Sequence, residues 1–243
     1  MSESDVVVFA AGSLFDAFSE IGAHYEAEHP GARVRFTFAS ADHLRQRLLD
    51  GERADVFASA NFEELRRARE DSLLDGPIHV FAHNRLQIIV AANSPHRITS
   101  LIDLARPGTR LAAEHAGAPL SGYTRLLLAR AQRDPAYGND FPSRFAANAV
   151  VPVATVRELV ARVAEGVADA GIVYVTDITP DVRTQLSTVD IPVDLNVTAD
   201  YAIGNLAARV RSGGNLEGRT FLELVLSPAG QLILQRWGFL PGA

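Results

Sequence analysis

The sequence contains no cysteine, which excludes disulfide bonds, thiolate zinc sites and cysteine nucleophiles. No apolar run reaches the length of a transmembrane helix, and aromatic residues make up only 7% of the 243 positions. Basic residues are outnumbered, with 23 Lys and Arg against 29 Asp and Glu, so the formal net charge is −6. This balance argues against a nucleic-acid partner. Because no leader precedes the first apolar run, we expect either a cytosolic protein or a mature secreted domain.

Common catalytic motifs are missing as well. The chain has neither the glycine-rich lysine loop of nucleotide-binding enzymes nor the G-x-S-x-G motif of hydrolases. His79 and His83 lie four apart, but their segment is predicted to be a strand, in which that spacing separates them by about 13 Å. We therefore interpret them as surface histidines. A hydrolase built on Ser13 would need an orienting acid, and none is evident, so no enzyme is expected.

The 47% of apolar residues instead follow a regular alternation of short strand patterns and amphipathic helix patterns. Helical spacing is present around Leu14–Tyr25, 44–49, 126–131 and 156–163. Alternating strands and helices are typical of an α/β fold with mostly parallel sheets. The predicted strands are 6–10, 33–39, 55–59, 86–92, 110–114, 171–175 and 187–192. The run LRRARE at 65–70 is predicted to be a solvated helix face.

Two extended runs, at 81–95 and 194–206, resemble connections between two lobes. If both are crossovers, residues 1–84 and 203–243 form lobe I and residues 85–202 form lobe II. The tail is predicted to form two helices separated at Ser227 and Pro228, because proline disfavours a helical conformation in the residue before it.

Small residues follow several strands directly before a helix. The first case is VVVFAAGSLFDAF at 6–18, and similar turns lie at 39–42, 119–122 and 154–156. Helix starts carry unpaired N–H groups and a partial positive charge, so several of them at one sheet edge can bind an anion without Lys or Arg. Taken singly, each serine or threonine is explained as an ordinary helix cap. The four turns together favour the anion site only weakly.

Four segments carry a resemblance to a known family: VFAAGSL at 8–14, ADVFASA at 54–60, VRELVARVAEGVADAGIVYVTD at 156–177 and SPAGQLILQRWGF at 227–239. Together they resemble the periplasmic molybdate-binding proteins of ABC importers over nearly the whole chain. The resemblance implies a type II periplasmic-binding-protein fold, in which two α/β lobes are joined by two crossover strands. It also implies that the ligand, a tetrahedral molybdate or tungstate, lies in the cleft.

The resemblance further implies the ligand-binding residues. In the family, two serines each give a hydroxyl and a backbone N–H to the anion. The first of these serines matches Ser13, and the position of the second aligns with Ala41. Backbone N–H groups match Leu120 and Val156, and a tyrosine hydroxyl matches Tyr174. The metal of the oxyanion is then bound only through its oxygens, and no cofactor is needed. The implied partner is an ABC permease, and the implied state is a monomer in the periplasm or lipid-anchored on the outer face of the cytoplasmic membrane.

Two departures from the family pattern leave alternatives open. Ala41 lacks the hydroxyl, which Ser40 could replace, and the carboxylate of Asp42 would repel an anion if it faced the ligand. The same fold could therefore bind a different oxyanion or a small carboxylate, and a cytosolic regulator or enzyme is a third possibility. We interpret Asp55 and Asp177 as structural carboxylates rather than ligand contacts.

Overall fold

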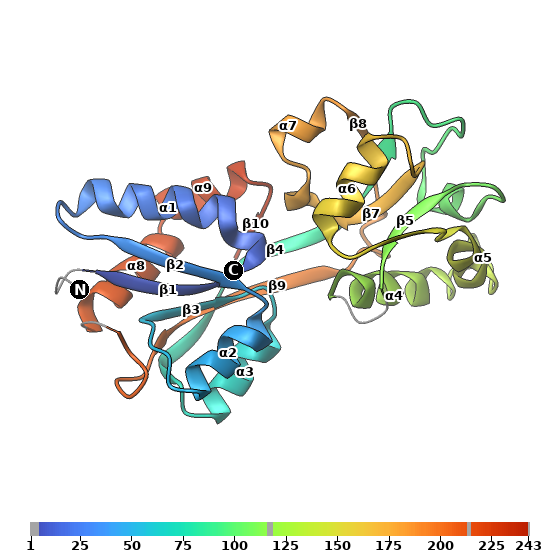
Figure 1. Ribbon diagram of the computed structural model, residues 1–243. Helices are drawn as coiled ribbons and strands as arrows, with labels where there is room; N and C mark the ends of the chain where they lie inside the picture. The colour runs from blue at the N-terminus through green and yellow to red at the C-terminus, as the bar shows by residue number, and fades with distance from the viewer. Residues whose placement is uncertain (1–4, 116–118, 213–214, 243) are drawn as a thin grey trace. The chain divides into compact units, whose positions relative to one another are not determined.

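The computed structural model describes residues 5–115, 119–212 and 215–242. The chain folds into two compact units (Figure 1), one formed by 1–84 with 199–243 and the other by 85–198. Each unit is an α/β layer structure with its own core, as the alternating sequence pattern predicts. Within the described ranges, no helix is both long and apolar enough to cross a membrane.

The sheet of unit 1 has the strand order β2-β1-β3-β9-β4-β10. Its strands are β1 (Val6–Ala11), β2 (Val34–Ala39), β3 (Val56–Ser59), β4 (Leu74–Ala91), β9 (Thr198–Leu206) and β10 (Leu240–Pro241). β1 runs parallel to β2 and β3, whereas β9 is antiparallel to β3. Because β1 is central and covered on both faces, nearly all of its residues are buried, which explains its unbroken apolar sequence.

Helices cover both faces of this sheet (Figure 1). One face carries α1 (Phe15–Glu28), α8 (Asn215–Leu226) and α9 (Pro228–Arg236), and the other carries α2 (Ala41–Leu49) and α3 (Phe62–Glu70). On the first face, the ring of Phe18 packs against Phe81 and Phe221 at 5.7 and 6.1 Å between centroids. On the second, Phe9 and Phe57 share a buried cluster with Leu44. These contacts fix α1 and α2 at the strand ends from which they start.

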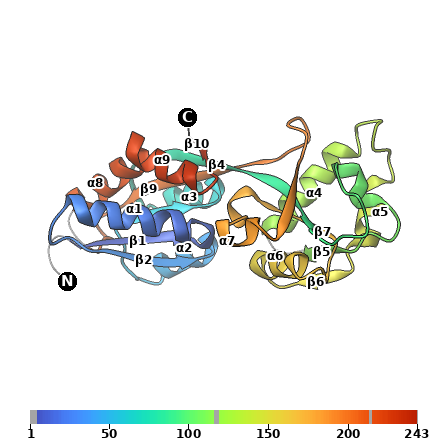
Figure 2. The ribbon, with the colours of Figure 1, turned by 90° about the horizontal axis from the view of Figure 1, so that it is seen from above.

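Unit 2 has a smaller sheet in the order β8-β4-β7-β5-β6. Its strands besides β4 are β5 (Leu111–Glu114), β6 (Val151–Val153), β7 (Ala170–Tyr174) and β8 (Leu186–Asp190). Its helical segments are η2 (Leu101–Ala105), α4 (Pro119–Ala131), α5 (Phe141–Asn148), α6 (Val156–Ala164), η3 (Val175–Asp177) and α7 (Pro180–Arg183). Seen from above, α6 lies on one side of β5 and β7, and α4 with α5 on the other (Figure 2). At Gly171 a Cβ would lie 2.5 Å from Leu159 Cδ2, so glycine allows α6 to pack closely on β7.

All seven predicted strands are present, with ends shifted by one or two residues, except that β4 begins twelve residues before its predicted start. The tail forms two helices as predicted, because the Ser227 hydroxyl accepts the Gly230 N–H at 3.2 Å and Pro228 opens α9. The helix α3 keeps Arg66, Arg67 and Arg69 exposed, which confirms the solvated face. Four short elements, η2, α5, α7 and β10, were not predicted, because they are too short to show a period. The strand β6 was implied only as the strand before the turn at 154–156.

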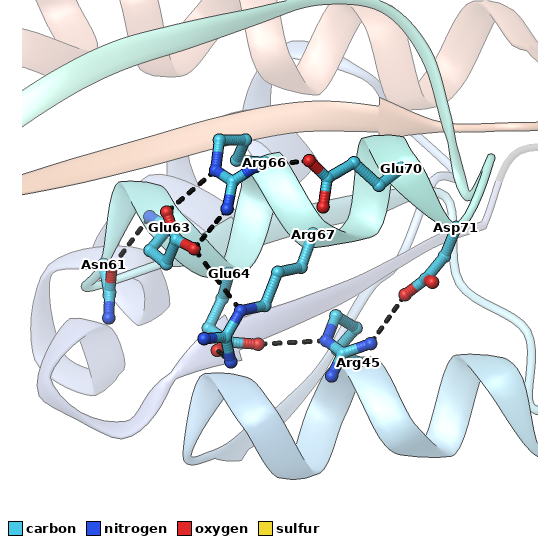
Figure 3. A network of polar contacts seen from close by, with 8 residues as sticks. All are labelled: Arg45, Asn61, Glu63, Glu64, Arg66, Arg67, Glu70 and Asp71. Atoms are coloured by element: carbon cyan, nitrogen blue, oxygen red, sulfur yellow. Dashed lines mark hydrogen bonds and ion pairs between the residues drawn. The ribbon is translucent and has the colours of Figure 1, made fainter.

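Ion pairs connect α2 to α3 on one side of unit 1 (Figure 3). Arg45 Nε lies 3.0 Å from Glu64 Oε2, and Arg45 Nη1 lies 2.6 Å from Asp71 Oδ2. Glu64 is buried and also pairs with Arg67 at 2.9 Å. Arg66, in contrast, is half exposed and pairs with Glu63 and Glu70 of its own helix. The two arginines therefore allow a matched comparison of a partly buried pair between helices with an exposed pair within one helix.

Replacing Arg45 with methionine is expected to lower the free energy of unfolding by about 1–2 kcal/mol, because Glu64 loses one of two partners in a desolvated place. Arg66→Met should lower the free energy of unfolding by no more than about 0.5 kcal/mol, because the carboxylates that pair with Arg66 are well solvated. Urea unfolding of both variants at neutral pH measures the difference. Equal losses for the two variants would show that the α2–α3 pair adds nothing beyond an ordinary surface pair.

Candidate functional site

Ser13 lies in the first turn of unit 1, where β1 passes through η1 (Gly12–Leu14) into α1. Its side chain is exposed, and its Oγ lies 2.9 Å from the hydroxyl oxygen of Tyr201. No side chain caps α1. The serine is therefore placed as a hydrogen-bonding group at the carboxyl edge of the sheet rather than as a side-chain cap.

Tyr201 and Asn84 were not predicted from the sequence, and both are buried beneath Ser13. Asn84 Nδ2 donates to the Tyr201 hydroxyl oxygen at 3.4 Å. In this arrangement Tyr201 can donate its own hydrogen to Ser13 Oγ, which leaves the Ser13 hydrogen available for a ligand. Hydrogen bonds in such a chain polarise one another and strengthen the last donor. Neither residue had a clear signal in the sequence, because Asn84 lies between His83 and Arg85, and Tyr201 follows Asp200.

The second turn lies beside the first, because β1 and β2 are parallel and Ala11 is in register with Ala39. Ser40 occupies the N-cap position of α2, and Ala41 is the first helical residue. The Ser40 hydroxyl lowers the pKa of Asp42 by hydrogen bonding to its carboxylate, with a further contribution from the His43 N–H. Asp42 therefore lies in the first turn of α2 with its carboxylate on the Ser40 hydroxyl, and an anion would compete with it for that hydroxyl.

In unit 2, α4 begins at Pro119, and the side chain of Leu120 is buried. The start of α6 is better defined. Thr155 is the N-cap, and its Oγ1 accepts the Glu158 N–H at 3.2 Å. Glu158 Oε2 in turn accepts the N–H of Ala154, the residue before the cap, at 2.9 Å. Neither bond uses the N–H of Val156, which is the group that the family resemblance implies as a ligand donor.

Tyr174 is the last residue of β7 and is nearly buried. Its ring packs edge-on against Tyr123 of α4, with centroids 5.9 Å apart. Its backbone N–H donates to Asp177 Oδ2 at 2.9 Å. Burial is the main cause that raises the pKa of Asp177 to about 7, with a smaller contribution from the neighbouring Glu114, while the hydrogen bond from the Tyr174 N–H opposes the shift.

Each unit thus gathers its predicted residues at one edge. Ser13, Ser40 and Ala41 follow the parallel strands β1 and β2, and Leu120, Val156 and Tyr174 follow or end the parallel strands β5, β6 and β7. Open α/β sheets bind ligands at the carboxyl ends of their strands. Among the described residues, no three His, Asp or Glu side chains could hold a metal ion. The donors are hydroxyls and peptide N–H groups, which suit an anion.

The fold and these edges define an extracellular solute-binding protein, and the sequence agrees. Residues 6–240 match the family model described as bacterial extracellular solute-binding protein, and the chain belongs to this family. The chain is 35% identical over 234 residues to molybdate-binding protein ModA of Mycobacterium bovis, covering 96% of this chain and 84% of the relative. Two solved structures share its fold. The first is the substrate-binding domain of a putative molybdenum ABC transporter from Clostridium difficile, with TM-score 0.79, 22% identity and 98% of each chain covered. The second is the Azotobacter vinelandii periplasmic molybdate-binding protein, with TM-score 0.76, 16% identity and coverage of 97% of this chain and 98% of that chain.

Proposed function

We propose that this protein captures molybdate or tungstate outside the cytoplasm and delivers it to an ABC permease. The observation that carries the proposal is the placement of Ser13, with its buried Tyr201 and Asn84 support, at the start of α1. The 35% identity to a molybdate-binding relative over nearly the whole chain supports the choice of ligand. The protein is proposed to act in the periplasm or lipid-anchored on the outer face of the cytoplasmic membrane, and to bind its ligand without catalysis.

The proposed mechanism uses uncharged donors from both units. The first unit supplies Ser13 with Ser40 and the Ala41 N–H, and the second supplies the N–H groups of Leu120 and Val156 and the hydroxyl of Tyr174. Desolvated N–H and O–H donors replace the hydration that a dianion loses on binding. Binding then stabilises the conformation of the chain that offers the oxyanion the most of these donors, by the difference in affinity between conformations.

Isothermal calorimetry with molybdate, tungstate, sulfate, phosphate and chromate tests the choice of ligand. We expect molybdate and tungstate to bind with dissociation constants far below millimolar and the other anions to bind more weakly. Ala41 and Asp42 favour the second candidate, a different oxyanion or a small carboxylate, because the family hydroxyl is missing and a carboxylate lies beside it. Binding of another anion with no heat from molybdate or tungstate at millimolar concentration would select that candidate.

Replacing Tyr174 with phenylalanine is expected to weaken oxyanion binding about tenfold or more, because one hydrogen bond to a charged ligand contributes about 1.5–3 kcal/mol. The ring would keep its packing against Tyr123, so the melting temperature should change little. Tyr123→Phe is the matched control, because it removes a hydroxyl from the partner ring. Equal dissociation constants for wild type and Tyr174→Phe would remove the Tyr174 hydroxyl from the site.

A further inference from the structure

Glu114 places a carboxyl group at the start of α6. It is the last residue of β5, and its register partner in β6 is Val153, two residues before the helix cap Thr155. The Val156 N–H hydrogen-bonds to the Glu114 carboxyl group and lowers its pKa. In the structure, therefore, a side chain of the protein already faces the peptide donor that the proposed function assigns to the oxyanion.

The surroundings of Glu114 oppose a negative charge. Its Oε2 is buried and has no hydrogen-bond partner. Burial raises the pKa of Glu114 above its ordinary value, and the effects that lower it come from His115 and the Val156 N–H. The carboxyl group of Asp177 in η3 is the acidic neighbour, and its pKa is raised by burial and by Glu114. A dianion arriving at Val156 would add a further negative charge to a place where charge is already unfavourable.

From this geometry we infer that Glu114 determines ligand specificity by binding in its protonated form, with its O–H donating to the same oxyanion that accepts the Val156 N–H. The inference rests on the proposed function and extends it. Protonation removes the repulsion and converts an acceptor into a neutral donor. This donor would make up for the hydroxyl that the chain lacks at Ala41.

The consequence is proton uptake on binding. Where free Glu114 is ionised, each bound oxyanion brings one proton with it, so the dissociation constant rises by up to tenfold per pH unit. Below the pKa of free Glu114 the affinity no longer changes with pH. A site made only of hydroxyls and peptide N–H groups would show neither effect, because none of those groups titrates near neutral pH.

Calorimetry with micromolar sodium molybdate from pH 6 to 8.5, in pairs of buffers with different ionisation enthalpies, measures both quantities. For wild type we expect uptake approaching one proton at pH 8.5 and a dissociation constant at least tenfold higher there than at pH 6. Glu114→Gln keeps a hydrogen-bond donor and should bind with the same affinity at every pH, at least as tightly as wild type at pH 6, without proton uptake. Glu114→Ala loses the donor and should bind about tenfold more weakly than Glu114→Gln, also without pH dependence.

Glu165→Gln is the matched control, because Glu165 is an exposed carboxylate at the other end of α6 and should leave the wild-type pH profile unchanged. Wild-type binding without proton uptake would overturn the inference while leaving the proposed function intact, and this result needs no variant to fold. An unchanged pH slope in Glu114→Gln would overturn it as well. The absence of binding at every pH would overturn the proposed function and the inference together.

Discussion

Replacing Ser13 with alanine is expected to raise the dissociation constant for molybdate at least tenfold with little change in fold. The Ser13 hydroxyl is the exposed end of a hydrogen-bonded chain that continues to Tyr201 and Asn84. Loss of one donor to a charged ligand corresponds to about 1.5–3 kcal/mol, or roughly 10- to 150-fold in affinity. The loss falls at the upper end if polarisation through Tyr201 strengthens the Ser13 donor.

Calorimetry gives the affinity, and the melting temperature of the free protein gives the effect on the fold. Ser19→Ala is a suitable control, because Ser19 is an exposed serine of α1 whose hydroxyl donates only to the Phe15 carbonyl of the preceding turn. Tyr201→Phe should weaken binding less than Ser13→Ala, since Ser13 remains but loses its support. If Ser13→Ala binds as tightly as wild type, Ser13 does not contact the ligand, whatever its position in the fold.

Replacing Asp55 with alanine is expected to destabilise the protein strongly, by about 3–5 kcal/mol. Asp55 is almost completely buried, and its two carboxylate oxygens accept the N–H groups of Val7 at 2.8 Å and Ser212 at 3.0 Å. One carboxylate thereby ties the first strand of the chain to a segment near its end. Alanine leaves both peptide donors without this acceptor in a desolvated place, which is among the most costly kinds of substitution.

Urea or thermal unfolding measures this loss, and Asp50→Ala serves as the control because Asp50 is an exposed carboxylate close by in sequence. Asp55→Asn should lose an intermediate amount of stability. Its amide oxygen can accept one of the two N–H groups, but its NH₂ group is a donor and cannot accept the other. If Asp55→Ala unfolds at the same urea concentration as Asp50→Ala, the carboxylate adds no net stability. The interpretation of Asp55 as a structural residue would then be wrong.

The sequence by itself determined the alternation of strands and helices, the break at Ser227 and Pro228, and membership of the solute-binding family. These features are local: hydrophobic period, capping chemistry and short motifs depend on residues close together in the chain. The positions of Ser13, Val156 and Tyr174 at strand ends were likewise predictable, because strands that share a sheet direction end at one edge.

Only the tertiary structure decided which side chains contact those residues. Tyr201 lies beneath Ser13 although 188 positions separate them, and Glu114 faces Val156 from a neighbouring strand. Asp42 was visible in the sequence, but its hydrogen bond to Ser40 depended on the side-chain conformation. The physical reason is that a side chain's hydrogen-bond partner and its pKa depend on distance and desolvation in three dimensions, and neither leaves a periodic signal along the chain.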